Sequence, residues 1–215
     1  MRTRQLALTG AAIAILASLA GGASPAFSVS RPACSAGRTI DISKSARVFV
    51  VTKASIRRVY GCSTSTRRVS YLGRRGDPGE GVDRVTVTGR RVAYVRNTAC
   101  SDEACSETVV VYDLKTRKQL SVAQATPSET LSVVRDIVLS AKGVVGWISE
   151  ARDRENPNVL TAVYVAARQP GLFRATKVVP LATGLNISIL SLALAGTTLY
   201  WTTQGPTAAN SAPLP

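Results

Sequence analysis

The phrase ARVFVV at Ala46–Val51 returns three times along the chain, as RRVAYV at Arg90–Val95, GVVGWI at Gly143–Ile148 and TTLYWT at Thr197–Thr202. Each copy is rich in β-branched and aromatic residues and follows a turn, which is typical of a buried strand. The matched residues Val48, Val92, Val145 and Leu199 lie 44, 53 and 54 residues apart. Periods of this size indicate a repeat architecture, and the four-stranded propeller blade is one such unit.

Strand-like segments fill each period, and helix-like periodicity is nearly missing after the N-terminus. The repeats span about 39–81, 82–129 and 131–184, and a shorter fourth begins at Asn186. We therefore predict an all-β domain, a β-propeller-like array of about three full four-stranded repeats plus a partial fourth. Thr39–Ser43 is predicted as the first strand of the first repeat. Three arrangements of the last blade are open: this strand or the segment before it completes the blade, the array stays open, or it closes by oligomerising. A β-sandwich is the alternative fold.

The N-terminus has the pattern of a secretory signal peptide. Arg2 and Arg4 precede the apolar run Leu6–Ala20, and small residues allow a cut after Ala26. We predict a signal peptide at 1–26, an irregular lead at 27–38 and the repeat domain at 39–215. An uncleaved N-terminal anchor is the alternative. After cleavage we expect no transmembrane segment and a secreted or cell-envelope location.

All four cysteines, Cys34, Cys62, Cys100 and Cys105, follow the predicted signal peptide. An even count in an exported chain favours disulfides, and three pairings are possible. A Cys100–Cys105 bridge would close one short loop and leave Cys34 for Cys62. Zinc is disfavoured, because the sequence has no histidine and no C-x-x-C.

The basic residues are concentrated in the first half of the chain. The net charge is +14. From Phe27 to Cys100 there are 15 basic and four acidic residues, and from Ser101 onward ten and nine. The possible anion-binding residues are Arg57, Arg58, Arg67, Arg68, Arg74 and Arg75. Arginine suits phosphate and carboxylate because its planar fork makes two bonds. The competing interpretation is solubility charge on hairpins.

Residues 90–118, RRVAYV through VVVYDLKTRK, resemble the repeat of TolB-like secreted β-propeller proteins, in which a strand leads to a V-Y-D-L-x-T-G-K hairpin. The matching residues are Val111, Tyr112, Asp113, Leu114, Thr116 and Lys118. Arg117 stands in place of the glycine. Asp113 is a residue type whose side chain bonds turn backbone groups. The resemblance implies a fold and no site residues, since that family has many functions. The arginine-rich composition suggests a bacterial source.

No catalytic or cofactor-binding constellation is evident. The acids Asp77, Glu80 and Asp83 are interpreted as turn residues in preference to a calcium site, and no cofactor is predicted. Asp102 with Glu103 and Asp153 with Glu155 are expected on long loops, where the alternative to solvated acids is a carboxylate pair for glycoside chemistry. Trp147 and Trp201 occupy matched repeat positions, which favours core packing over sugar stacking.

These observations favour a secreted, non-enzymatic binding or scaffold protein, because no histidine is present to act as a general base. Its expected partner is a protein or an anionic cell-envelope polymer. Nucleic acid is disfavoured by export and by an aromatic content of 5%. The alternatives are an anion-binding adhesin of the cell envelope and, ranked below it, a carbohydrate-active enzyme.

Overall fold

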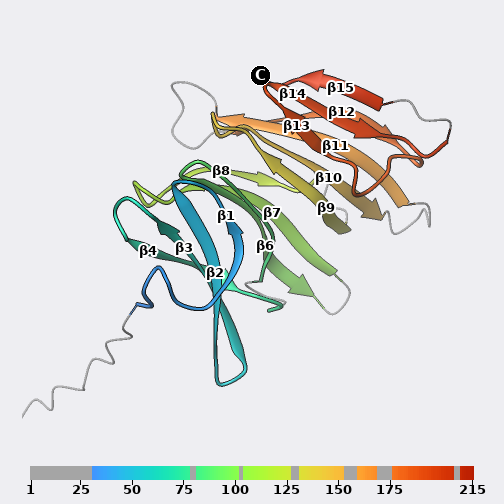
Figure 1. The fold of residues 1–215 in the computed structure, drawn as a ribbon. Coiled ribbons are helices and arrows are strands. Elements are labelled where there is room, and N and C mark those ends of the chain that lie inside the picture. The colour runs from blue at the N-terminus through green and yellow to red at the C-terminus, as the bar shows by residue number, and fades with distance from the viewer. Residues whose placement is uncertain are drawn as a thin grey trace, which may run out of the picture. The chain divides into compact units, whose positions relative to one another are not determined.

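The computed structural model describes residues 31–77, 81–101, 104–126, 131–152, 159–168, 176–205 and 209–215. The regular elements in these ranges are β-strands, and they form four separate antiparallel sheets, here called blades (Figure 1). The expected signal peptide, residues 1–26, lies outside the described ranges, and the lead enters them at Arg31. The described residues contain no helix long and apolar enough to cross a membrane.

Each blade is formed by consecutive strands. The first blade contains β1 (Arg38–Ile42), β2 (Ala46–Lys53), β3 (Ile56–Ser63) and β4 (Val69–Arg74). The second contains β5 (Val82–Thr88), β6 (Arg91–Ser101), β7 (Ala104–Asp113) and β8 (Lys118–Gln124). The third contains β9 (Leu131–Leu139), β10 (Val145–Arg152), β11 (Val159–Arg168) and β12 (Thr176–Gly184). The fourth contains β13 (Ala193–Ala195), β14 (Thr198–Thr202) and β15 (Ala209–Pro213).

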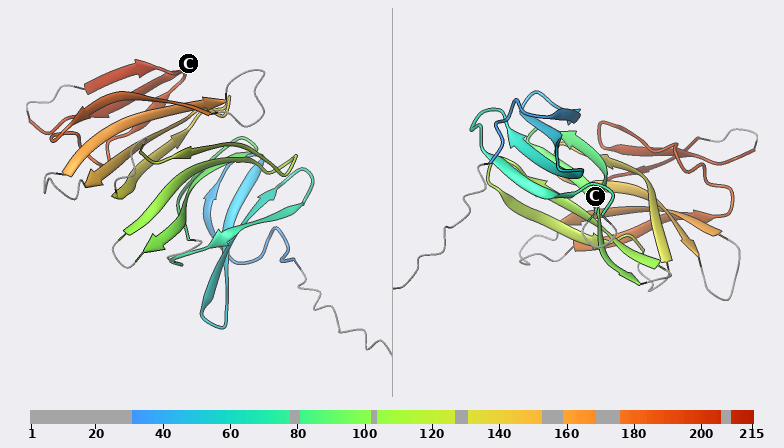
Figure 2. Two further views of the ribbon diagram at one scale, coloured as in Figure 1. Left: turned by 180° about the vertical axis from the view of Figure 1, so that it is seen from behind. Right: turned by 90° about the horizontal axis from the view of Figure 1, so that it is seen from below.

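This strand order confirms the β-propeller-like array and rules out the β-sandwich. In every blade the strands pair in sequence order, so no strand crosses from one sheet to another. A Greek-key sandwich would exchange strands between its two sheets. The two further views in Figure 2 show the same succession, with the colours advancing from one sheet to the next.

The recurring phrase forms the second strand of each blade, as predicted. Val48, Val92 and Leu199 are fully buried and Val145 is 1% exposed. Their side chains belong to hydrophobic clusters that fill the seams between successive blades. The phrase is therefore the part of the repeat that holds neighbouring blades together.

Three clusters fill the three seams. The seam between the first and second blades contains Val48, Val59, Val92 and Leu114. The next seam contains Val95, Val111, Trp147 and Tyr164. The third seam contains Ile148, Val163, Leu199 and Trp201. Trp147 is fully buried and donates its Nε1–H to the Ala125 carbonyl at 2.8 Å, and Trp201 is 5% exposed. Both tryptophans therefore have the core role that the repeat predicted.

The hairpin at Asp113 explains why the V-Y-D-L segment is a turn. Asp113 Oδ1 accepts the backbone N–H groups of Lys115 and Thr116 at 2.9 and 3.0 Å, and its Oδ2 pairs with Arg90 Nε at 2.7 Å. Arg117, in place of glycine, still adopts a left-handed φ of 58°. The turn thus keeps its geometry at the conformational cost of a side chain with positive φ.

The fourth blade has three strands and stays open within the described residues. Thr39–Ser43, predicted as the first strand of the 39–81 repeat, falls at β1 and pairs with β2 in the first blade, so it does not complete the last blade. The lead is tied to that same blade through Cys34. Neither segment pairs with β15, so the array ends in a strand with one unpaired edge in the described residues.

Candidate functional site

The first strands of three blades share an irregularity that positions charged side chains. The register skips one residue in each strand: Ile40 in β1, Arg84 in β5 and Arg135 in β9. Such bulges redirect side chains and are frequent beside functional sites. Arg84 adopts a φ of 42°, in the left-handed region that a residue with a long side chain rarely occupies. Backbone of this kind persists only where the surrounding structure imposes it.

A recess of about 320 Å³ lies against these bulges. Its charged lining residues are Arg75, Asp83, Arg84 and Asp136, and its apolar ones are Ile40, Val82, Val85 and Ile137. They come from the first three blades, so the recess depends on the blades being stacked. We name this site the inner recess.

The two basic groups of the inner recess are available to a ligand. Within the ranges that the structure describes, neither Arg75 nor Arg84 forms an ion pair. Arg84 is exposed and Arg75 is half-buried. An unpaired guanidinium offers several donors in a planar fork, so each of these side chains has the chemistry to bind a carboxylate or a phosphate.

The acidic group Asp136 is already engaged with backbone. Its Oδ2 accepts the N–H of Leu192 at 3.0 Å, and its Oδ1 accepts the N–H of Ile137 at 2.9 Å. Burial raises the pKa of the Asp136 carboxyl, and these two bonds and the charge of Arg84 oppose that rise. Asp136 therefore joins the third and fourth blades, and its two carboxylate oxygens already accept backbone hydrogen bonds.

Carboxylates bridge the other two seams in the same way. Asp41 Oδ2 accepts the N–H of Val87 at 2.7 Å, and Glu107 Oε2 accepts the N–H of Val134 at 2.5 Å. Burial is the main cause that raises the pKa of Glu107. Each seam thus has one acidic side chain that satisfies a backbone donor of the following blade, which limits the cost of burying that donor.

The six predicted arginines divide into two groups at opposite ends of the first blade. Arg57 and Arg58 follow Ile56 at the start of β3, and Arg58 lies opposite Arg74 in the register. The backbone N–H of Arg75 donates to the Arg57 carbonyl at 2.8 Å, which places all four together. Arg67 and Arg68 lie in the connection between β3 and β4, just before the start of β4. Strand β4 separates them from Arg74 by about five residues, or roughly 17 Å along the strand. Only Arg75 of the six lines the inner recess.

The first group forms a basic edge, which we define as Arg57, Arg58 and Arg74. Arg74 Nη1 pairs with Asp77 Oδ2 at 3.2 Å, and its hydrogen bond to that carboxylate raises the pKa of Arg74. Like charges directly opposite each other destabilise a sheet. The facing Arg58 and Arg74 therefore make a local excess of positive charge that a bound anion would neutralise.

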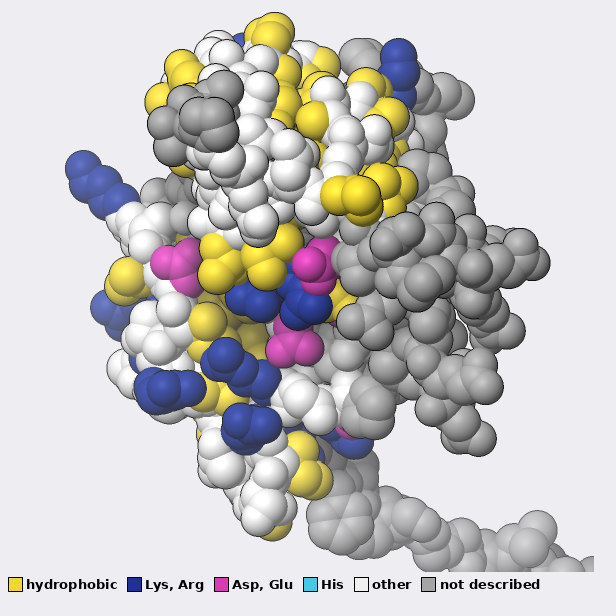
Figure 3. Space-filling view, turned by 90° about the vertical axis from the view of Figure 1, so that its right-hand side faces the viewer, with side chains coloured by type: hydrophobic (Ala, Val, Ile, Leu, Met, Phe, Trp, Pro, Cys, Tyr) yellow, Lys and Arg dark blue, Asp and Glu magenta, His cyan; other side chains and the backbone are white. Residues whose placement is uncertain are grey.

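Charge is unevenly distributed over the molecule. On the face shown in Figure 3, basic and acidic side chains gather in the middle and lower part, and the top is mostly apolar or uncharged. The sequence explains this difference, since no Asp, Glu, Lys or Arg follows Lys177. The fourth blade, with all its strands after that residue, is uncharged.

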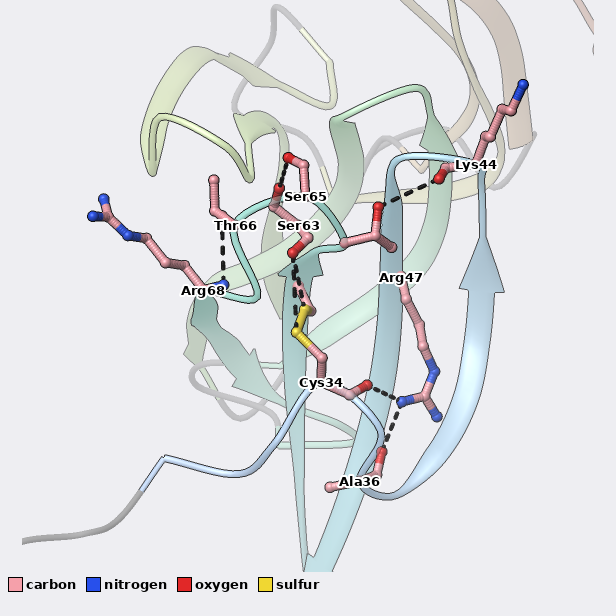
Figure 4. Close-up of a disulfide and its surroundings, with 10 residues drawn as sticks. Cys34, Ala36, Lys44, Arg47, Ser63, Ser65, Thr66 and Arg68 are labelled. Carbon is pink, nitrogen blue, oxygen red and sulfur yellow. Dashed lines mark hydrogen bonds between the residues drawn. A yellow bond between two sulfur atoms is a disulfide. The ribbon is translucent and has the colours of Figure 1, made fainter.

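The Cys34–Cys62 disulfide is confirmed, with a Cα–Cα distance of 5.6 Å. It fixes the lead to the outer face of the first blade, where Phe49 and Tyr60 are stacked with centroids 5.7 Å apart. Arg47 donates to the Cys34 and Ala36 carbonyls, and Figure 4 shows its guanidinium directed at these two oxygens. The same guanidinium carbon lies 4.8 Å from the Phe49 ring centroid. One cation therefore holds both the lead and the aromatic face.

The predicted Cys100–Cys105 bridge stays a prediction. The two residues face each other in the β6–β7 register. Directly opposed strand residues have Cα separations within the range that a disulfide needs. The backbone is thus compatible with the short loop that the sequence suggested.

The acidic loop residues proposed for glycoside chemistry, Asp102, Glu103, Asp153 and Glu155, lie outside the described residues, as does Glu80. Among the described residues, no three His, Cys, Asp or Glu side chains are grouped so that they could hold a metal ion. The carboxylate-pair hypothesis therefore stays a prediction from the sequence.

Sequence reasoning missed the inner recess. Arg84 and Asp136 were not singled out, because bulges rather than strand alternation place them. One signal was present: Asp41-Ile42 and Asp136-Ile137 repeat a dipeptide in the first strands of two blades. In both, the aspartate follows the bulged residue and bonds to the next blade.

Comparisons with known proteins do not identify a family. No protein-family model and no curated protein matches the sequence. The chain is similar to the β-propeller domain of the Trilobed protease from Pyrococcus furiosus, with a TM-score of 0.34 and 9% identity over 80% of this chain and 64% of that one. It is also similar to the apo form of the AtxE2 isopeptidase, with a TM-score of 0.25 and 11% identity over 81% and 38% of the two chains. The fold assignment accordingly rests on strand order and register.

Proposed function

We propose that the chain is an extracytoplasmic, non-enzymatic binding protein, and that the inner recess holds the anionic group of a polar ligand. The observation that supports this proposal most directly is that Arg75 and Arg84 line one recess and form no ion pair in the described ranges. The left-handed φ of 42° at Arg84 supports this interpretation, since such strain concentrates at ligand sites.

The composition of the recess indicates the ligand class. Arg75 and Arg84 suit a carboxylate or phosphate, and Asp83 is half-buried in the same lining and suits a hydroxyl or amino donor. A sugar or polyol that carries an anionic group has both features. One repeating unit of an anionic cell-envelope polymer belongs to this class.

Two observations support an extracytoplasmic, non-enzymatic role. The Cys34–Cys62 disulfide is typical of an oxidising compartment. The sequence contains no histidine, and Asp136 in the recess is bound to two backbone N–H groups, which suits a structural role better than proton transfer.

The experiment is a calorimetric titration of the protein with glycerol phosphate, glucuronate and inorganic phosphate. We expect saturable binding that weakens more than tenfold in the double variant Arg75→Gln/Arg84→Gln, since two charge-assisted bonds are lost. The matched control is Arg67→Gln/Arg68→Gln, which removes the same charge at the far hairpin and should change the Kd less than twofold. Equal weakening in both variants would show a general charge effect and contradict the proposal.

The second candidate function is an anion-binding adhesin of the cell envelope, favoured by the opposed Arg58 and Arg74 of the basic edge. In that case a long anionic polymer such as teichoic acid binds along the edge. The variant Arg58→Gln/Arg74→Gln would then abolish retention on the polymer, whereas Arg75→Gln/Arg84→Gln would not. Retention must also weaken as salt rises, because exposed charges are screened.

A further inference from the structure

A second cavity lies away from the inner recess and has a different chemistry. Its volume is about 530 Å³, within the range of small-molecule pockets. The second blade contributes residues of β6 and β8 to its lining. The third blade contributes residues of β11, β12 and the turn before β10, and Pro215 completes the lining. We name it the outer cavity.

The floor of the outer cavity is apolar, and the charged side chains in its lining are all basic. Leu120, Val144, Val165 and Val179 provide apolar surface. Arg91, Lys142 and Lys177 lie in the same lining, which includes no Asp or Glu side chain among the described residues. Lys142 and Lys177 are exposed, so their ammonium groups reach solvent. An apolar floor with a cationic rim matches an amphipathic anion.

Arg91 gives an independent indication of a missing partner. Its guanidinium donates to the Ala141 carbonyl through Nη1, yet its Nε is buried without a hydrogen-bond partner among the described residues. A buried unsatisfied donor on a cation carries a large desolvation cost. Gly143 has a φ of 90°, and a Cβ there would come within 3.3 Å of Arg91 Cδ. The turn at Gly143 therefore packs against Arg91 in the cavity lining, where the Nε–H of Arg91 has no acceptor among the described residues.

We propose that the outer cavity binds a small amphipathic anion, with its apolar chain over the valine and leucine side chains and its carboxylate or phosphate at Arg91, Lys142 and Lys177. The ligand is taken as a single molecule from solution. Burial of the chain supplies most of the affinity, and the cationic rim supplies selectivity for charge. This site is separate from the inner recess, so the two proposals stand or fall independently.

The first experiment titrates the intact protein calorimetrically with submicellar laurate and lauryl phosphate, and compares lauryltrimethylammonium and decyl maltoside. We expect saturable one-to-one binding of the two anions and none of the cation or the neutral amphiphile. Equal binding of all four, or no saturable binding of the anions, would overturn the proposal. Binding to anionic phospholipid vesicles without binding of monomeric laurate would also overturn it.

The second experiment locates the site with variants. Lys142→Gln/Lys177→Gln should weaken laurate binding about tenfold at low salt, since each exposed cation contributes modestly. The matched control Lys115→Gln/Lys118→Gln removes two exposed lysines, one in the β7–β8 turn and one at the start of β8, and should leave the Kd unchanged. Ala167→Trp should fill the cavity and abolish binding, with a thermal melt to show that it folds. An unchanged Kd in the Lys142/Lys177 variant would place the laurate elsewhere.

Discussion

The first and fourth blades are both ends of the array, yet their exposed sides differ. Each contributes a fully buried second-strand residue to its seam, Val48 and Leu199. The first blade has four strands, a disulfide and a packed outer face. The fourth has three strands, and Tyr200 in its central strand is 39% exposed. The repeat thus sets the face that meets another blade, and the first and fourth blades differ on the faces that meet no other described blade.

Charge follows the same division. The first blade contains all six arginines that the sequence singled out, whereas the fourth has no charged residue. An uncharged blade can pack but cannot attract an ion from a distance, because long-range attraction needs net charge. This difference is why the proposed ligand site is assigned to the basic half of the molecule.

The largest expected effect on stability comes from removing the Cys34–Cys62 disulfide of the first blade. Cys34→Ala/Cys62→Ala should lower the free energy of unfolding by about 3 kcal/mol, since the bridge closes a loop with a sequence separation of 28. Urea denaturation measures it. Cys100→Ala/Cys105→Ala is the control, with a smaller expected loss because its loop is short. An unchanged midpoint in the first variant would mean that the first blade is no better secured than the fourth.

The next effect concerns the cation of the outer face. Arg47→Ala should cost about 2 kcal/mol, because Arg47 donates to the Cys34, Ala36 and Gly37 carbonyls and covers Phe49. Arg38→Ala is the matched control, an exposed arginine at the start of β1, and should cost little. Equal losses of stability in thermal denaturation of the two variants would show that the contacts of Arg47 do not stabilise the first blade.

Hairpin turns give a smaller contrast. In the first blade, Ala54 and Ser55 have φ values of 48° and 65°, whereas the β13–β14 turn of the fourth blade uses Gly196 at 61°. Ser55→Gly should therefore stabilise the protein by about 1 kcal/mol, and Gly196→Ala should destabilise it by a similar amount. Differential scanning calorimetry of both variants tests the pair. Shifts of the same sign would contradict the difference between the two turns.

The smallest effect is the pH dependence at Asp136, which joins the fourth blade to the third. Its pKa is raised in the folded protein, so the folded state binds more protons than the unfolded state across that interval. The contribution of Asp136 to stability therefore grows as pH falls from above the raised pKa toward the ordinary one. Asp136→Asn should flatten this part of the pH–stability curve, measured by urea titration. A curve identical to that of the natural protein would be the contrary result.

Much of the architecture could be predicted from the sequence, because the phrase around Val48, Val92, Val145 and Leu199 reports burial directly. The Cys34–Cys62 pairing was one of three that the sequence allowed, and the structure selects it. The inner recess could not be predicted in this way. Arg75 and Arg84 line the same recess because three blades stack and because a bulge turns Arg84 out of the strand alternation. The stacking leaves no pattern in the sequence that marks these arginines, and the bulges leave only the repeated Asp-Ile dipeptide of Asp41-Ile42 and Asp136-Ile137.

The proposed binding role is tested most directly by observing the arginine side chains themselves. The Nε–H signals of the arginines can be followed by NMR during a titration with glycerol phosphate. We predict saturable shifts of the Arg75 and Arg84 signals with one shared Kd, while those of Arg67 and Arg68 stay in place. Equal, non-saturating shifts across all the arginines, or no shift at Arg75 and Arg84, would contradict a built anion site in the inner recess.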